Sequence, residues 1–456
     1  MDLIIKNGTV VTADDQFKAD VGVAGGKIVA LGANLQDECA QVINASDQLV
    51  LPGAIDAHTH LAMPFGGTVS ADGYGAGTRA AVCGGVTTVF DYPMQRAGHG
   101  IVETVEARRR MAEQEAACDF AFHCCITDLN GGAILDEFPA AVAYGVSSFK
   151  CFFVYKKEGM MVDDATFVKI LLRAKECGAI TNLHAENPDM IDLRVAQYLQ
   201  EGKTSAWYHY MSRPEFVAAE ADKRAVHWAE NVDAPLYLVH MSDKEGLLAA
   251  VQAKLNGAKI FIETCPQYLE FTCDVYKRPD GRNFVCSPPM KGEASRAALW
   301  KAIQVGAIDT VATDHCPFQQ AEKDWGINDF TKIPNGCAGV ENLYPYMLGA
   351  ATDGKISYSR AVALCATNPA RIFGCTNKGS LAVGKDADIV LYNPKQDFTI
   401  SVSNMHSDYD HTIWEGVTVH GYPTKVFVRG NLAYSDGAFV GKAGSGKFVA
   451  CAPVHF

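Results

Sequence analysis

The residues of this chain best suited to chemistry are gathered in one short segment, Asp56-Ala57-His58-Thr59-His60, which ends an apolar run. On a β-strand, residues two apart face the same side, so the imidazoles of His58 and His60 can reach one metal ion. Four more candidate ligands each end an apolar, strand-like run: Lys150, His184, His240 and Asp314. Donors that converge from separate parallel strands at one end of a barrel are the usual geometry of a barrel active site. The pattern favours a metal-dependent hydrolase.

Each candidate ligand also has a purely structural interpretation. A single histidine at the end of a strand is more often a hydrogen-bonded core residue than a ligand, but neighbouring buried imidazoles require a reason. Asp314 follows Val311-Ala312-Thr313, where a buried carboxylate is costly unless it meets a cation. Its alternative role is the N-cap of a following helix. The joint occurrence of four such histidines is hard to explain by packing.

Lys150 lies within an apolar segment, 147–153, where its ammonium would be desolvated. Burial lowers the pKa of a lysine and leaves a neutral amine. Such an amine can add CO₂ and become a carbamate, a carboxylate on a long arm that could bridge two metals. The alternative is a buried lysine that forms an ion pair with an acid. From the chemistry alone, the carbamate and the ion pair are equally favoured.

The elements that must position these side chains form a regular series. Eight strand-like runs are interleaved with segments that we predict to be helices, including 102–117, 164–177, 213–231 and 294–305. Strands that alternate with helices at this spacing indicate parallel βα units, and eight of them close a (β/α)₈ TIM barrel. The predicted strands are 53–60, 86–91, 120–124, 147–152, 179–184, 236–240, 259–264 and 309–314.

The two ends of the chain have a different pattern, with short strands and glycine turns. We expect residues 1–50 and 378–456 to form one small β-sandwich domain, with the barrel, residues 51–377, inserted between them. The C-terminal tail, residues 444–456, could reach a neighbouring subunit. The fold class is therefore α/β, a barrel with a β-sandwich built from both termini.

Composition narrows the classes of partner. At 456 residues and 48% hydrophobic content, the chain can bury a large core, and its net charge of −12 argues against a nucleic-acid partner. The 15 cysteines contain no C-x-x-C pair, so we expect them to be reduced and mostly buried. With no secretory signal pattern and no membrane-length apolar run, we expect a cytoplasmic protein with no membrane partner.

Several stretches match a known family and together extend over nearly the whole chain: 52–60, 77–81, 84–88, 148–150, 184–187, 312–315, 329–336 and 383–390. Through them the chain resembles the cyclic amidohydrolases, and above all the dihydropyrimidinases and hydantoinases. The resemblance implies a site for two divalent ions, usually zinc. His58, His60 and Asp314 would hold one ion and His184 and His240 the other. Lys150, carbamylated by CO₂ to N6-carboxylysine, would bridge them.

The resemblance also implies a reaction. A hydroxide shared by two metals roughly 3.5–4 Å apart would open a cyclic ureide, a dihydropyrimidine or a 5-substituted hydantoin, to an N-carbamoyl amino acid. Asp314 fits as the base that takes the proton and passes it to the leaving nitrogen. Tyr155 matches the family's oxyanion donor, and Ser287 and Asn335 match positions that bind the amide edge of the substrate largely through backbone groups. The family further implies a homo-oligomer, a tetramer or dimer.

Tyr155, Ser287 and Asn335 also have purely structural interpretations. They could belong to a surface loop, a proline-rich turn and an Asn-Gly turn, respectively. Met63, Phe65, Phe152 and Phe153 could line the pocket for a ring substituent or belong to the core.

Other enzymes remain as alternatives. Dihydroorotases place an arginine two residues after the second histidine to hold a carboxylate, and this chain has Ala62 there. An allantoinase stays open, although Tyr155 favours the dihydropyrimidinase branch, and a phosphotriesterase-like hydrolase shares only the ligand set. Some relatives of dihydropyrimidinase have lost metal ligands and act as cytoskeletal scaffolds, but all six ligand positions are retained here.

Overall fold

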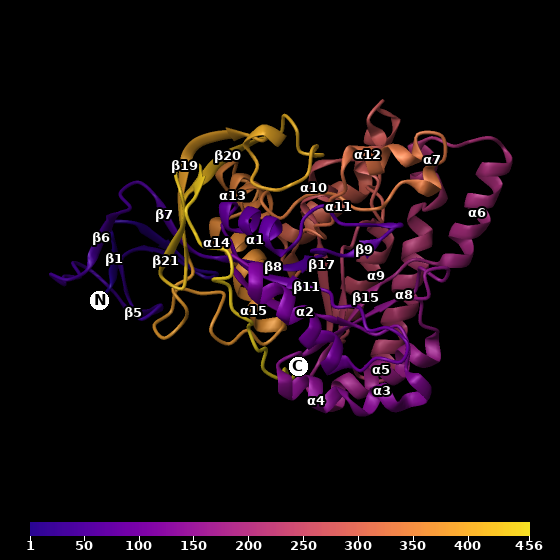
Figure 1. Ribbon diagram of the computed structural model, residues 1–456, viewed down its shortest axis with the longest axis horizontal. Helices are drawn as coiled ribbons and strands as arrows, with labels where there is room; N and C mark the ends of the chain where they lie inside the picture. The colour runs from indigo at the N-terminus through magenta and orange to yellow at the C-terminus, as the bar shows by residue number, and fades with distance from the viewer.

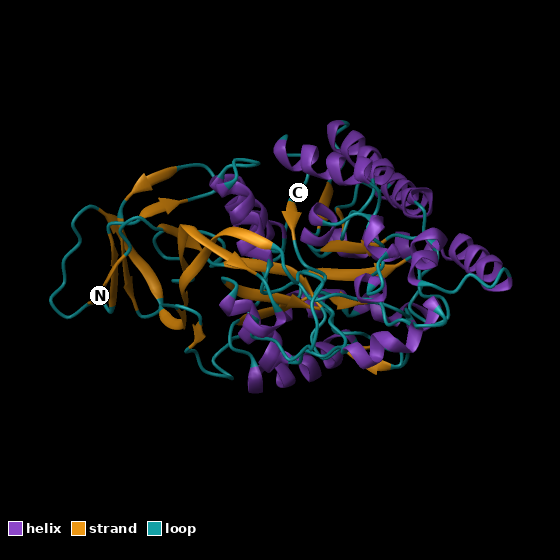
Figure 2. Cartoon of the chain, turned by 90° about the horizontal axis from the view of Figure 1, so that it is seen from above, coloured by secondary structure: helices purple, strands orange, loops and turns teal.

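The computed structural model describes the whole chain, residues 1–456, as a barrel with a β-sandwich at one side (Figure 1). Eight strand positions make up the barrel. Helices lie outside these strands (Figure 2). The barrel strands are β8 (Ala54–Thr59), β11 (Val86–Asp91), β12 (Asp119–Phe122) continued by β13 (Cys124–Cys125), β14 (Ser148–Phe152), β15 (Ile180–His184), β16 (Leu236–Leu238), β17 (Ile260–Thr264) and β18 (Thr310–Val311). The predicted TIM barrel is confirmed.

The barrel closes through parallel pairings along its whole circumference. One arc has the order β12-β11-β8 and the other the order β13-β14-β15-β16-β17-β18. The last strand position returns to the first through a parallel bridge between Thr59 and His315, where the His60 N–H donates to the carbonyl of His315 at 2.8 Å. Strands such as β11 are buried along their whole length, which explains why they read as continuous apolar runs.

The outer helices begin and end within two residues of the predicted bounds. In α5, Asp163 is the N-cap and its side chain accepts a hydrogen bond from the Thr166 N–H. The main outer helices are α1 (Tyr74–Cys83), α2 (Ile101–Glu115), α4 (Phe138–Tyr144), α5 (Asp164–Glu176), α8 (Glu215–Asn231), α9 (Lys244–Leu255), α11 (Glu293–Gln304) and α13 (Leu343–Thr352).

Further short elements lie in the connections around the barrel. The hairpin of β9 (Pro64–Phe65) and β10 (Thr68–Val69) follows the first barrel strand. The remaining helices are α3 (Ala133–Asp136), α6 (Pro188–Gln200), α7 (Ala206–Ser212), α10 (Pro266–Glu270), α12 (Gln320–Lys323), α14 (Tyr358–Val362) and α15 (Asn368–Ile372). No helix is both long and apolar enough to cross a lipid bilayer.

The sandwich joins strands from both ends of the chain. One sheet has the order β5-β4-β1-β6 and the other the order β22-β21-β20-β19-β7-β2-β3. Its strands are β1 (Leu3–Lys6), β2 (Thr9–Val11), β3 (Gln16–Lys18), β4 (Asp20–Ala24), β5 (Lys27–Gly32), β6 (Gln41–Asn44), β7 (Leu49–Pro52), β19 (Ile389–Thr399), β20 (Thr418–Val428), β21 (Asn431–Ser435) and β22 (Ala438–Phe439).

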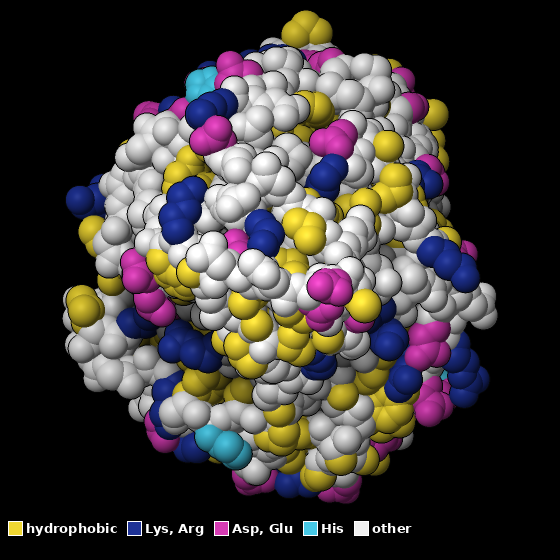
Figure 3. Space-filling model, turned by 90° about the vertical axis from the view of Figure 1, so that its left-hand side faces the viewer, with side chains coloured by type: hydrophobic (Ala, Val, Ile, Leu, Met, Phe, Trp, Pro, Cys, Tyr) yellow, Lys and Arg dark blue, Asp and Glu magenta, His cyan; other side chains and the backbone are white.

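The larger sheet of the sandwich serves two cores because its residues alternate between faces. Ile389 and Leu391 of β19 belong to the sandwich core, whereas Val390 and Tyr392 belong to the large core shared with the barrel. On the sandwich end of the molecule, side chains of both charges are interspersed with scattered hydrophobic ones (Figure 3), so this face carries no extended field of one sign.

A buried lysine joins the sandwich to the barrel. The Lys378 ammonium lies 2.9 Å from a carboxylate oxygen of Asp386 and 2.7 Å from one of Asp388, and it also pairs with Asp119 at the start of β12. Burial would lower the pKa of Lys378, but the carboxylates outweigh it and raise the pKa above its ordinary value.

The C-terminal tail, which we expected could reach a neighbouring subunit, has hydrogen-bond partners within its own chain. It lies on its own barrel, at the end where the strands begin: the Val449 N–H donates to Phe120, Cys451 to Gly145 and Val454 to Gly178. The backbone groups exposed at the starts of the barrel strands and at helix ends provide these partners, so the tail caps the bottom of the barrel.

Candidate metal centre

The predicted site residues lie around one cavity at the end of the barrel where the strands finish. β8, β14 and β15 carry His58, Lys150 and His184, while His60, His240 and Asp314 follow the ends of β8, β16 and β18. The cavity is lined by these six side chains together with Tyr155, Ser287, Asn335, Met63, Phe65, Phe152, Met160, Cys316 and Gly336. Phe153 instead is buried against Phe167 in the core, because it faces away from the barrel axis.

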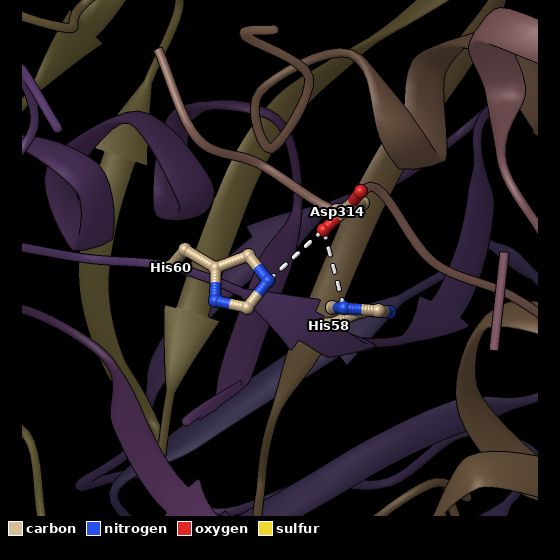
Figure 4. Close-up of side chains that lie close together, drawn as sticks. All are labelled: His58, His60 and Asp314. Carbon is tan, nitrogen blue, oxygen red and sulfur yellow. Dashed lines mark ion pairs between the residues drawn. The ribbon is translucent and has the colours of Figure 1, made fainter. Parts of the chain in front are cut away.

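Asp314 stands between two imidazoles (Figure 4). Its Oδ1 lies 3.1 Å from Nε2 of His58 and 3.0 Å from Nε2 of His60. Two ligand atoms bound about 2 Å from one tetrahedral ion are about 3.3 Å apart, so the three atoms have the spacing of a shared metal site.

Nδ1 of His58 points away from the cavity, and its hydrogen bond decides that Nε2 faces the cavity. Its Nδ1–H donates to Oε1 of Glu263 at 2.7 Å, and burial lowers the pKa of His58 so far that the ring is neutral. Nε2 therefore presents a lone pair to the carboxylate of Asp314. Two acceptor atoms 3.1 Å apart repel each other unless a cation lies between them, so this donor set fits a metal ion.

A second imidazole pair lies across the cavity. Nδ1 of His184 is 3.0 Å from Nε2 of His240, while Nε2–H of His184 donates to Glu186 at 2.9 Å. As with His58, a carboxylate behind the ring turns the free nitrogen of His184 into the cavity. Burial also lowers the pKa of both histidines and favours the neutral form that a metal requires.

The backbone at two of these candidate ligands departs from the predicted strands. β16 ends at Leu238 and β18 at Val311, short of the predicted ends at 240 and 314. His240 and Asp314 have φ values of 42° and 54°, in the left-handed region that non-glycine residues seldom adopt, and Tyr155 has φ 63°. Such conformations break the strand ladder and cluster at functional sites, where surrounding contacts maintain them.

Lys150 has an environment that disfavours the charged ammonium. Its side chain is 1% exposed, its nitrogen makes no hydrogen bond or ion pair with the chain, and the ring centre of Tyr92 lies 5.1 Å from that nitrogen. Burial lowers its pKa to about 8. The interpretation as a lysine paired with an acid is not supported by any carboxylate contact.

Three acidic residues behind the site were given no role by the sequence-based reasoning. The Glu263 carboxylate accepts hydrogen bonds from His58, from the His240 N–H at 2.9 Å and from the Tyr237 hydroxyl at 2.8 Å. Glu186 holds His184, and Asp56 accepts hydrogen bonds from Thr313 next to Asp314. The available signal was an acid inside or beside an apolar strand, as in Phe261-Ile262-Glu263-Thr264.

The remaining predicted residues complete the cavity wall. The ring of Tyr155 packs edge-on against Phe65 and His184, with centroids 5.3 and 5.2 Å away. Burial raises the pKa of Tyr155 well above its usual value, so its hydroxyl keeps a proton that it can donate. Asn335 Nδ2 donates to the Ser287 hydroxyl at 2.9 Å, which brings these two distant loops side by side.

Comparison with known proteins gives consistent matches. A model of the amidohydrolase family matches residues 49–433. The D-hydantoinases of Ralstonia pickettii and Rhizobium radiobacter are each 40% identical to this chain, with 98% of both chains covered. The crystal structure of dihydropyrimidinase from Brevibacillus agri NCHU1002 superposes with a TM-score of 0.98 at 40% identity, covering 100% of both chains.

Proposed function

This chain belongs to the amidohydrolase family, and from that premise we propose that it opens cyclic amide rings by hydrolysis. The proposed substrates are dihydropyrimidines or 5-substituted hydantoins, and the products are N-carbamoyl amino acids. The observation that carries the proposal is the convergence of four imidazoles, one carboxylate and an unpartnered buried lysine on a cavity that also contains Tyr155, Ser287 and Asn335. Relatives named D-hydantoinase and dihydropyrimidinase support it.

We assign two divalent ions, zinc in the first instance, to this cavity. His58, His60 and Asp314 would hold one ion, and His184 and His240 the other. Lys150 would bridge them as a carbamate, formed when its neutral amine bonds to the carbon of CO₂ and releases one proton. When bound, the ions lower the pKa of water to about 7 and polarise the ring carbonyl.

Asp314 is the proposed proton carrier. Burial would raise the pKa of its carboxyl, but as a ligand beside a divalent cation it would be held in the ionised form. An ionised carboxylate at neutral pH can accept a proton from the attacking water. The same group then delivers that proton to the ring nitrogen as the amide bond breaks.

Tyr155 and two peptide groups are proposed to hold the ring. The Tyr155 hydroxyl donates to the oxygen that gains negative charge when the carbonyl is attacked. The backbone groups of Ser287 and Asn335 pair with the amide edge, which has both donors and acceptors. Met63, Phe65 and Phe152 supply apolar contacts to the ring substituent.

A neutral ring fits this cavity better than an acidic one. At the position where dihydroorotases have an arginine, this chain has Ala62. Arg108 approaches the same loop, but its Nε donates to Asp91 at 2.8 Å and its other donors point to the carbonyls of Leu61 and Ala62. No free guanidinium therefore remains there for a substrate carboxylate.

The function is tested with one metal-loaded preparation and a panel of rings. Dihydrouracil, hydantoin, phenylhydantoin, allantoin and dihydroorotate are compared by kcat/KM, and metal content is measured by elemental analysis. We expect about two divalent ions per chain, loss of activity on chelation, and turnover of the first three rings. Better turnover of dihydroorotate or allantoin would overturn the substrate assignment, and full activity without metal would overturn the mechanism.

We further propose that the enzyme is a homo-oligomer of two or four chains in the reducing cytoplasm. The cysteines support the second point, because none is paired and all but Cys39, Cys177 and Cys273 are buried. Light scattering of the purified protein tests the first: a monomer at micromolar concentration would contradict it.

A further inference from the structure

Two short segments, 285–288 and 334–336, form the side of the cavity that we assign to the amide edge of the substrate. We call them the amide-edge segments. Within them, the peptide N–H and C=O groups of Ser287 and Asn335 make no hydrogen bond to the chain, although Ser287 is 6% exposed. Buried peptide groups are nearly always paired, so these four groups are free for a ligand.

The carbonyls on either side of Ser287 are all held in place. The carbonyl of Cys286 accepts from Nε2–H of His209 at 2.8 Å, and that of Pro288 accepts from the Tyr268 hydroxyl at 2.7 Å. The carbonyl of Val285 accepts from the Gly336 N–H at 2.9 Å, which joins the two segments directly. The free groups are thus presented by a backbone whose neighbouring groups cannot turn.

One side chain reaches both segments. The Lys323 ammonium donates to the carbonyl of Val285 at 3.0 Å, of Pro334 at 2.8 Å and of Gly336 at 2.7 Å. These three bonds use all three N–H donors of a lysine. Pro334 and Gly336 flank Asn335, and their carbonyls have no other donor in the chain.

Lys323 is held rigidly and carries no ion pair. Its side chain is 1% exposed, and no carboxylate oxygen lies within 4 Å of its nitrogen. The three carbonyl dipoles therefore compensate the buried charge, together with the ring of Phe318, whose centre is 5.6 Å away. It ends α12, whose first turn is fixed by a hydrogen bond from the Gln319 N–H to Glu322 at 2.8 Å. Glu322 also accepts a hydrogen bond from Thr68 in the β9–β10 hairpin, whose Phe65 lines the cavity.

We propose that Lys323 is the positioning residue that sets the spacing of the two amide-edge segments, and with it the recognition of the cyclic amide. The proposal rests on the proposed function. A lysine suits this role because its ammonium directs three N–H groups tetrahedrally at three carbonyls, whereas the planar guanidinium of arginine cannot. Bonds from a charged donor are also stronger than neutral ones, which fixes the geometry more firmly.

The test compares Lys323→Met with Lys323→Arg and with a matched control, Lys378→Met. Lys378 is also buried and also has three acceptors, but it lies between barrel and sandwich, away from the cavity. Kinetics on hydantoin, metal content and thermal stability are measured for each. Contacts to the amide edge form in both the bound substrate and the transition state, so their loss should act mainly on KM.

For Lys323→Met we expect a KM roughly tenfold higher, a smaller change in kcat and unchanged metal content. Lys323→Arg should lie between this variant and the wild type, and it carries the test if the methionine variant does not fold. Lys378→Met should melt earlier with an unchanged KM.

Wild-type KM in the folded Lys323 variants, or a raised KM that accompanies metal loss, would overturn the proposal. Turnover by the wild type is measured first: its absence on every cyclic amide refutes the proposed function instead.

Discussion

Replacing Glu263 should weaken metal binding even though its carboxylate touches no proposed metal. Oε1 of Glu263 accepts from His58 Nδ1 at 2.7 Å and from the His240 N–H at 2.9 Å, so one atom orients a ligand of each proposed ion. Oε2 accepts from the Tyr237 hydroxyl at 2.8 Å. The residue is therefore the common support of both halves of the site.

The magnitude follows from what each substitution leaves behind. Glu263→Gln keeps the shape and an oxygen for the first two donors, while Tyr237 can turn its proton to Thr310, 2.6 Å away. Burial raises the pKa of Glu263 to about 8, and a bound cation would favour its ionised form. The glutamine loses only that charge, and the difference between a charged and a neutral hydrogen bond is about 1–1.5 kcal/mol. That difference corresponds to roughly tenfold weaker metal binding. Glu263→Ala leaves the donors unpaired and should approach a 100-fold loss.

The assay titrates metal-free enzyme with zinc in the presence of a competing chromogenic chelator. Tyr237→Phe is the matched control, because it removes one hydrogen bond to Glu263 but leaves the carboxylate and both ligand contacts in place. We expect the apparent Kd to rise in the order wild type, Tyr237→Phe, Glu263→Gln, Glu263→Ala. Wild-type zinc affinity in a folded Glu263→Ala would refute the reasoning.

Three further predictions concern other parts of the molecule. Tyr155→Phe should lower kcat by roughly 10²–10³ with KM and metal content unchanged, and near-normal kcat would reduce Tyr155 to a loop residue. Lys150→Ala should lose metal and activity, and short carboxylic acids should restore part of the activity. The intact mass should show a CO₂ adduct only in the unsubstituted chain. A free ammonium at Lys150 in the metal-loaded enzyme would exclude the carbamate. Lys378→Met should lower the free energy of unfolding by about 3–5 kcal/mol, because it leaves the buried carboxylate of Asp388 without a cation. Asp119 and Asp386 keep Arg429 and Lys27 as partners. Burial raises the pKa of Asp386, but Lys378 outweighs burial and lowers that pKa below its ordinary value. The stabilisation by Lys378 is therefore present above the ordinary carboxyl pKa and is lost as pH falls. The stability gap between wild type and Lys378→Met should therefore stay constant at neutral pH and narrow as pH falls below 3.8, the ordinary carboxyl pKa, in denaturant titrations. A gap that widens in that range would contradict this account.

The order of the strands and helices in the barrel was predictable from local sequence patterns. A strand buried on both faces must be apolar along its length, as in Val86–Asp91, and the predicted and observed bounds of that strand coincide. Helix bounds were equally local, because capping residues such as Asp163 occur where a helix begins. The histidines, Lys150 and Asp314 were found as polar residues that end apolar runs, since strand ends in a parallel barrel meet at one rim.

Contacts between distant segments were beyond the reach of those patterns. Glu263 supports His58 across 205 positions, and the ends of β16 and β18 depend on left-handed φ values that tertiary contacts impose. The tail caps its own barrel through backbone hydrogen bonds, which leave no mark in side-chain composition.

The sequence alone determined which residues are apolar, where the strand and helix periods change, and hence which polar side chains gather at one rim. Only the tertiary structure decided which acid stands behind which imidazole, and that Lys323 holds Val285, Pro334 and Gly336 together. The physical reason is that burial follows from local periodicity, whereas the partner of a buried polar group depends on which distant segment the fold brings within about 3 Å.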